Sequence, residues 1–330
     1  MSAVPKAELH VHLEGTATPD LVRRIAKRNG LDIPEGVFAA PDRFAWRDFL
    51  DFLNTYNLVC SVIRTAEDYR DITYEYLASC AADGAIYVEV TASVDHSRIA
   101  GISDDEHWEG IAAGIDDARV DHGIEARILS VAVRNYGVAR AIEIAELTAA
   151  RPHPYVVGFS LAGDEAGYPP EPFADAYRVA ADAGLGCTVH AGEWAGADSV
   201  RGALELPVTR IAHGVRAIED PGLVRELAAR EITLEVCPTS NVVLGVFPSF
   251  DEHPFPALRE AGIPLTLGSD DPPYFGASVG GEYEIARRHF GLGDDELIGV
   301  TRTAIKASFA ETALRDRLLT ELTNGEAPSR

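Results

Sequence analysis

Two histidines spaced one residue apart near the start of the chain are the first candidate metal ligands. His10 and His12 lie in the apolar run AELHVHLEG, which extends from Ala7 to Gly15. Residues i and i+2 of a β-strand point to the same face, so a strand here would place both imidazoles together. Two imidazoles buried side by side carry a desolvation cost unless they bind a charge or a metal. The pair therefore indicates half of a metal site.

Three further polar fragments each follow a short apolar segment that is typical of a buried strand. These fragments are HAGE, with His190, AHG, with His213, and SDDP, with Asp270. Imidazole nitrogen and carboxylate oxygen are ligands of catalytic zinc, and Fe²⁺ or Mn²⁺ would accept the same donors. Such an ion lowers the pKa of its bound water to about 7. A metal that activates water in this way needs no nucleophilic side chain, so we expect hydrolysis by water at one Zn²⁺ per chain.

The candidate ligands fall at the ends of predicted strands. Strand-like and helix-like segments alternate along the chain, and eight strands close a parallel barrel. The predicted fold class is therefore α/β, a (β/α)8 TIM barrel whose site forms at the carboxyl ends of the strands. The predicted strands are 7–13, 85–91, 125–133, 156–161, 185–190, 210–213, 233–237 and 264–268.

Helical patterns separate these strands, and several begin at Pro or an acidic residue and stop at Gly. Examples are 20–29, 66–82, 171–183 and 221–230. Two stretches exceed a normal connection. The first, 30–64, contains the aromatic run FAWRDFLDF at 44–52, which predicts an extra helix over the barrel mouth, and the second, 281–322, predicts a helical C-terminal tail. Since single barrels commonly reach 330 residues, we expect one domain over residues 1–330.

The amino-acid composition limits the classes of molecule that this protein is expected to bind. A formal charge of −23 would repel nucleic-acid polymers and anionic lipid heads, so a small molecule is the expected partner. The four cysteines, Cys60, Cys80, Cys187 and Cys237, form no CxxC pair and are predicted to be free thiols. The first residues lack a basic segment followed by an apolar one, which predicts a cytoplasmic protein. The sequence does not distinguish a monomer from a homo-oligomer.

Six motifs in this order resemble those of the adenosine deaminase family, within the amidohydrolase superfamily. They are HVHLEG, LAGDE, HAGE, AHG, CPTSN and GSDDP, and the resemblance extends from Pro5 to about Phe309. Any one of these motifs is weak evidence, whereas the ordered set is specific. The P-C-x-x-C motif that accompanies H-x-E in cytidine-type deaminases is absent from the sequence, so that combined pattern is not present.

The resemblance implies a role for each candidate residue. Glu193 would protonate N1 of a purine ring while C6 is attacked, and His213 would orient the attacking oxygen. Asp271 would hydrogen-bond the N7 side, and the backbone N–H of Gly163 would meet N3. The implied zinc ligands, of which His12 would also border the substrate, are His10, His12, His190 and Asp270. The chemistry is consistent, because attack at C6 is easier when N1 accepts a proton.

Glu14 is where the chain departs from relatives that accept adenosine, since these commonly have Asp at this position near the ribose. Adenosine, giving inosine and ammonia, is the leading predicted substrate. Adenine and a 5′-modified adenosine such as aminodeoxyfutalosine are the alternatives. A related amidohydrolase acting on a non-purine substrate and a purine-binding protein without activity are weaker hypotheses. The histidines outside these motifs, which are His96, His107, His122, His153, His253 and His289, are expected to play no part in the site.

Overall fold

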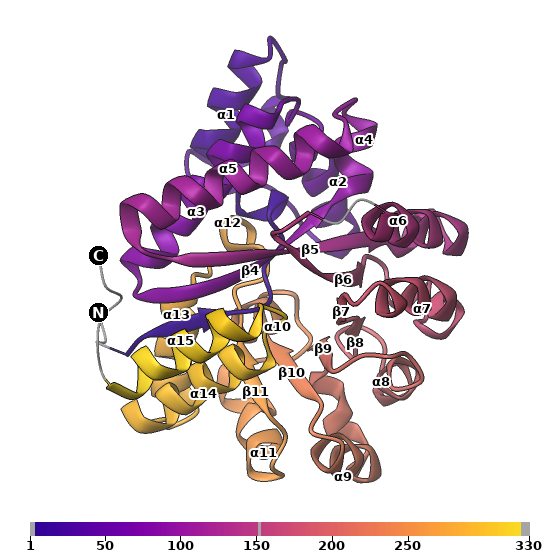
Figure 1. Cartoon of the computed structure of the whole chain (residues 1–330), viewed down its shortest axis with the longest axis vertical. Coiled ribbons are helices and arrows are strands. Elements are labelled where there is room, and N and C mark those ends of the chain that lie inside the picture. Colours follow the sequence, from indigo (N-terminus) through magenta and orange to yellow (C-terminus); the bar gives the residue numbers. More distant parts are fainter. Residues whose placement is uncertain (1–3, 151–152, 325–330) are drawn as a thin grey trace.

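The strands form two parallel sheets in the computed structural model, which describes residues 4–150 and 153–324. The first sheet has the order β1-β4-β5-β6-β7 and the second the order β11-β10-β9-β8 (Figure 1). The strands of the first sheet are β1 (Lys6–Glu8), β4 (Ala85–Ser93), β5 (Glu125–Val133), β6 (Val156–Ala162) and β7 (Gly186–Cys187). Those of the second are β8 (His190–Ala191), β9 (Arg210–His213), β10 (Thr233–Val236) and β11 (Leu265–Leu267).

The two sheets meet at the fifth predicted strand, which is divided into β7 and β8. The backbone between them is hydrogen-bonded to both sides. Thr188 N–H donates to Phe159 O at 3.1 Å in the first sheet, and Ala212 N–H of the second sheet donates to Val189 O at 2.9 Å. The prediction of one continuous strand over 185–190 missed this division, because the change of pairing partner depends on the neighbouring strands.

The other ends of the two sheets approach each other where the first predicted strand continues beyond β1. His12 N–H donates to Asp270 O at 3.0 Å, and Asp270 N–H donates to His10 O at 3.1 Å. An isolated parallel bridge also joins His12 to Thr91 on β4. These bonds hold two candidate metal-binding segments, one at each end of the sequence, against each other.

Helices surround the strands, as expected when parallel strands are buried on both faces. In Figure 1, α3 and α5 cover β4 and β5, and α14 lies beside β1. Thr65 and Ser103 form capping boxes that start α3 and α5. The helices are α1 (Pro19–Arg28), α2 (Phe49–Cys60), α3 (Ala66–Ala82), α4 (Val94–Ile99), α5 (Asp104–His122), α6 (Val138–Ala150), α7 (Ala174–Asp182), α8 (Ala197–Ala203), α9 (Pro221–Ala229), α10 (Pro238–Val243), α11 (Phe255–Glu260), α12 (Pro272–Phe275), α13 (Val279–His289), α14 (Asp294–Ala307) and α15 (Thr312–Asn324).

The long connection at 30–64 contains a hairpin as well as a helix. Strands β2 (Phe38–Ala40) and β3 (Arg43–Phe44) pair in antiparallel fashion before α2. The helix predicted over 44–52 begins later, at Phe49, because Asp48 caps it by accepting the N–H of Asp51 at 3.0 Å. The ring of Phe44 instead stacks on Tyr274 of α12, with centroids 4.4 Å apart.

The predicted C-terminal helical region is confirmed as α13, α14 and α15. Between α14 and α15, Phe309 stacks on the guanidinium of buried Arg210, with 3.6 Å from its central carbon to the ring centroid. Arg210 begins β9, so this contact lies at the amino ends of the strands, away from the candidate ligands. Among the described residues, no helix is both long and apolar enough to span a membrane.

Candidate active site

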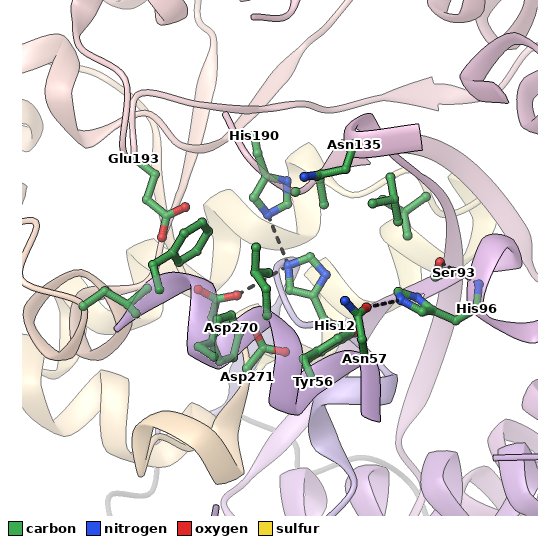
Figure 2. Close-up of a pocket in the computed structure, with 18 of the residues that line it drawn as sticks. His12, Tyr56, Asn57, Ser93, His96, Asn135, His190, Glu193, Asp270 and Asp271 are labelled. Carbon is green, nitrogen blue, oxygen red and sulfur yellow. Dashed lines mark hydrogen bonds and ion pairs between the residues drawn. The ribbon is translucent and has the colours of Figure 1, made fainter. Parts of the chain in front are cut away.

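A cavity of about 190 Å³ opens at the carboxyl ends of the strands, where the sequence predicted the site. Its wall contains aromatic side chains of α2 and polar side chains of the loops that follow the strands (Figure 2). The described residues that line it are His12, Phe49, Phe52, Leu53, Tyr56, Asn57, Ser93, His96, Val131, Val133, Asn135, Tyr136, Ala162, Gly163, His190, Glu193, His213, Leu244, Asp270, Asp271 and Phe275.

The four predicted metal ligands lie together. The Nε2 atom of His190 is 3.1 Å from the Nε2 atoms of both His10 and His12. Asp270 Oδ1 lies 3.4 Å from His12 Nε2 and 3.8 Å from His10 Nε2. A tetrahedral ion with bonds of about 2.0–2.1 Å separates its ligand atoms by roughly 3.3 Å, so this spacing fits one metal ion. Figure 2 shows His12, His190 and Asp270 converging on one point.

The outer nitrogens of two of these histidines show why a cation fits here. His10 Nδ1 lies 3.1 Å from Glu235 O, and His190 Nδ1 lies 3.0 Å from Leu161 O. A carbonyl oxygen only accepts, so each Nδ1 carries the proton of the neutral ring and each Nε2 presents a lone pair. Two lone pairs 3.1 Å apart repel each other unless a cation lies between them. The donor set therefore fits a divalent metal.

Other buried groups also come within ligand distance of this point. His213 groups with His10 and His190, and Cys237 groups with His10 and Asp270. Burial raises the pKa of the Cys237 thiol well above its usual value, which disfavours the thiolate that metals bind. His213 Nε2 lies 3.6 Å from Glu193 Oε2 and 3.8 Å from Asp270 Oδ2. His213 therefore lies between the predicted proton donor and a predicted metal ligand.

Glu193 is buried on the cavity wall, in the loop after β8. Burial, followed by the negative charges of Asp270 and Glu165, raises its pKa well above the usual range. A carboxyl group whose pKa is raised by burial and neighbouring negative charge is suited to general-acid catalysis. This environment supports the role that sequence resemblance implies for Glu193.

Glu165 holds the loop that carries Glu193. Its place in the motif LAGDE did not indicate this role. The carboxylate of Glu165 is buried and follows β6. It accepts the backbone N–H groups of Gly192, Glu193 (3.1 Å), Trp194 (2.8 Å) and Ala195 (3.1 Å), and the hydroxyl of Ser199 (2.5 Å). Five donors on one carboxylate fix the position of the loop.

Asp271 lines the cavity beside Asp270, and burial, followed by the charge of Asp270, raises its pKa well above the usual value. Its Oδ1 atom is buried without a hydrogen-bond partner. A buried unpaired polar atom is costly. Gly15 makes room for it, since a Cβ at Gly15 would lie 1.7 Å from Asp271 Oδ1.

Gly163 lies on the cavity wall with a φ of 108°, a conformation that side chains rarely adopt. A Cβ at this position would also lie 2.3 Å from Asn135 Oδ1. Only glycine therefore lets the backbone of LAGDE border the cavity at this position, and the use of its N–H by a substrate stays a prediction.

Glu14 does not line the cavity, although it was predicted to bind the substrate. Its carboxylate is buried, accepts Ser93 N–H at 2.9 Å and lies 3.4 Å from the hydroxyl of Tyr69. Burial raises its pKa to about 7. Ser93 and Tyr56 both interact with the Glu14 carboxylate and line the cavity, so Glu14 contacts the cavity wall from behind through these two residues.

The aromatic segment and two histidines contribute more to the site than the sequence indicated. The Oδ1 atom of Asn57, on α2, lies 2.9 Å from His96 Nε2, and both side chains line the cavity (Figure 2). His96 was expected to play no part in the site. His253, also expected to play none, is hydrogen-bonded to Asn241 behind the cavity. All four cysteines are free and buried, as predicted.

Comparisons with known proteins agree over nearly the whole chain. The adenosine deaminase family model matches residues 5–324. An adenine deaminase of Chelativorans sp. (strain BNC1) is 46% identical over 318 residues, which are 96% of this chain and 97% of that protein. The crystal structure of an adenine deaminase from Arthrobacter aurescens has a TM-score of 0.89 and 32% identity, and the match covers 97% of this chain and 98% of that one.

A solved amidohydrolase from Burkholderia ambifaria with bound Zn is also similar, with a TM-score of 0.88 and 27% identity. The match covers 98% of this chain and 90% of that one. The similar structures therefore include one named as an adenine deaminase and one that contains zinc.

Proposed function

The chain belongs to the adenosine deaminase family, and from this membership we propose that it hydrolyses the free base adenine to hypoxanthine and ammonia. The observation that carries this proposal is the 46% identity to an adenine deaminase over 96% of the chain. Adenosine, the leading substrate predicted from the sequence, is not supported by these relatives, whereas the alternative of adenine is. Deamination of a 5′-modified adenosine has no specific support.

The wall of the cavity supports a small, uncharged substrate. Among the described lining residues there is no Lys or Arg, whereas there are carboxyl groups and neutral polar side chains. A substrate phosphate buried here would lack the cation that such groups require. Part of the wall is formed by Asn57 and His96, a neutral pair suited to a ring nitrogen or a hydroxyl.

The proposed reaction adds water to C6 of the purine and breaks the bond from C6 to the amino nitrogen, which leaves as ammonia. His10, His12, His190 and Asp270 would hold zinc, which when bound supplies an acidified water as nucleophile at neutral pH. Glu193 holds the proton that is passed to N1 as C6 is attacked. His213 Nε2 faces Glu193 and Asp270 and orients the oxygen that attacks.

The substrate is held by groups on the other side of the ring. The raised pKa of Asp271 lets its carboxyl group share a hydrogen with N7. The backbone N–H of Gly163 donates to N3. These contacts fix the ring so that C6 faces the metal-binding side chains, which is the orientation that proximity requires.

We further propose that the two sheets form one closed (β/α)8 barrel within a single domain over residues 1–330. Two observations support the closure. Thr188 N–H donates to the first sheet while Val189 O accepts from the second, and His12 pairs with Asp270. The similarity to the Arthrobacter aurescens enzyme along 97% of the chain supports the single domain. In a closed barrel the candidate ligands would all border one mouth.

A substrate panel tests the proposed function. Adenine, adenosine, deoxyadenosine, methylthioadenosine, aminodeoxyfutalosine and N6-substituted adenines would be followed by ultraviolet absorbance and ammonia release, with Glu193→Gln as the inactive control. We expect adenine to exceed adenosine by at least about 10²-fold in kcat/KM, since a misfitting sugar costs several kcal/mol in a closed site. Faster turnover of any nucleoside would contradict the proposal, and turnover of none of these purines would contradict the activity itself.

A further inference from the structure

A line of hydrogen bonds reaches His213 from the side away from the cavity. Phe255 N–H, at the start of α11, lies 3.2 Å from His253 Nδ1. His253 Nε2 lies 3.2 Å from Asn241 Oδ1, and Asn241 Nδ2 lies 3.2 Å from His213 Nδ1. His213, Asn241 and His253 are all buried. Water therefore does not compete for these contacts.

The direction of every bond in this line follows from its first donor. A backbone N–H only donates, so His253 Nδ1 accepts and the proton of the neutral ring lies on Nε2. Burial lowers the pKa of His253 to about 3, so its ring is neutral at neutral pH. Asn241 Oδ1 accepts that proton, which leaves the Asn241 amide to donate to His213 Nδ1. The proton of a neutral His213 ring then lies on Nε2.

This arrangement is the reverse of the one at His10 and His190. Their Nδ1 atoms face carbonyl oxygens, so their Nε2 atoms carry lone pairs. The Nδ1 atom of His213 faces an amide donor instead. Three buried imidazoles within ligand distance of one point thus differ in the partner of the outer nitrogen.

We propose that Asn241 and His253 are positioning residues that keep His213 in the tautomer protonated on Nε2, so that it donates a hydrogen bond in the cavity and does not bind the metal. The consequence for catalysis rests on the proposed function, since an Nε2–H group aims a lone pair of the attacking oxygen. The tautomer itself depends on no substrate. It follows from contacts within the chain.

The test combines a spectroscopic and a kinetic measurement on the full-length, zinc-loaded protein. Nitrogen-15 chemical shifts of labelled histidine distinguish protonated from unprotonated ring nitrogens. In the wild type, we expect His213 to show a protonated Nε2 and an unprotonated Nδ1. In Asn241→Asp the new carboxylate only accepts, so His213 should become protonated on Nδ1. A wild-type His213 protonated on Nδ1 would overturn the proposal, whether or not adenine is a substrate.

The kinetic arm uses adenine and two variants of His253. In His253→Gln, the side-chain amide can still donate to Asn241, so kcat should stay within about threefold of wild type. His253→Leu removes the donor. This variant and Asn241→Asp, each made singly, should lower kcat at least tenfold with an unchanged zinc content and a KM within threefold. Equal kcat values in the Gln and Leu variants, both folded by circular dichroism, would contradict the proposal.

Discussion

The two ends of the strands bury charged side chains in different ways. At the amino ends, Arg210 is paired with Glu89 at 2.7 Å and with Glu235 at 2.6 Å, and Phe309 covers its guanidinium. At the carboxyl ends, imidazole nitrogens face each other at 3.1 Å and Asp271 keeps an unpaired buried oxygen. At the first end, the charge of Arg210 is matched by carboxylates of the chain itself. The second contains buried groups whose natural partners are a cation and a substrate.

This difference teaches how to separate structure from function in this chain. Burial alone does not distinguish a structural residue from a functional one, since Arg210 and His10 are both almost inaccessible to water. What differs is whether the chain itself provides the opposite charge or hydrogen-bond partner. Changes at Arg210 should therefore alter mainly stability, although its partner Glu235 also lies 3.9 Å from His10 Nδ1, and changes at the carboxyl ends should alter metal binding and turnover.

The largest expected effect is at the metal-binding end. His12→Ala should remove the metal and lower kcat/KM by at least about 10⁴-fold, because the pKa of water would no longer be lowered from 15.7. Elemental analysis and adenine turnover measure the two quantities. His289→Ala, which changes a partly exposed histidine on α13, is the control and should keep both. Full metal occupancy in His12→Ala would show that the ligand set is wrong.

The next effect is at the opposite end. Arg210→Met leaves Glu89 and Glu235 buried without their cation, which should lower the free energy of unfolding by about 3–5 kcal/mol. Urea denaturation at fixed zinc concentration measures this change. Arg259→Met, which removes an exposed ion pair with Glu296, should cost less than about 1 kcal/mol. Equal losses in the two variants would remove the distinction between a paired core and the surface.

Glu193→Gln separates the proton from the metal within the site. The amide keeps the shape of the side chain but holds no transferable acid, so kcat should fall by at least about 10²-fold while zinc content is unchanged. Steady-state kinetics and elemental analysis check both expectations. Loss of zinc in this variant would make Glu193 a ligand, and a near-normal rate would place the acid elsewhere.

The smallest effect concerns Glu282, whose Oε1 atom is buried without a hydrogen-bond partner and whose other oxygen accepts Thr239 N–H at 3.2 Å. Burial raises its pKa from 4.5 to about 8. An acid whose folded pKa is raised is protonated in both states below pH 4.5, and its ionisation costs stability increasingly from pH 4.5 to 8. Glu282→Gln should therefore stabilise the protein by roughly 1–3 kcal/mol more at pH 8.5 than at pH 5.5.

Thermal unfolding at the two pH values measures this difference, with Glu284→Gln on the exposed side of the same helix as the control. A gain that is the same at both pH values would show that Glu282 does not change its charge over this range.

The sequence predicted the order of elements well because each strand is a local apolar run. The run at 125–133 became β5 with the same bounds, and 66–82 became α3 with the same bounds. Where the predicted bounds were wrong, the cause lies in contacts between residues distant in the sequence. The first predicted strand continues past β1 only through bridges to Thr91 and Asp270, which lie far away in the sequence.

The candidate site shows the same limit. His10, His12, His190 and Asp270 were predictable because their residue types and positions at strand ends suffice to suggest a metal. Glu165 was not, since its role depends on four N–H groups of a loop that begins 27 residues later. A glutamate four residues beyond a predicted strand looks like any exposed loop residue until the fold buries it.

Two of the strand ends carry a further consequence through their backbone. His213 and Asp270 have φ values of 61° and 63°, in a region that costs non-glycine residues about 1–3 kcal/mol. His and Asp tolerate this conformation better than most side chains, but Gly adopts it freely, so His213→Gly or Asp270→Gly would relieve the strain while removing the imidazole or the carboxylate. Turnover would be lost in both cases. Because Asp270 is a proposed ligand of a metal that stabilises the folded chain, a library selected only for heat resistance should lose His213 before Asp270, and recovering an active thermostable enzyme would require selecting for ammonia release at the same time.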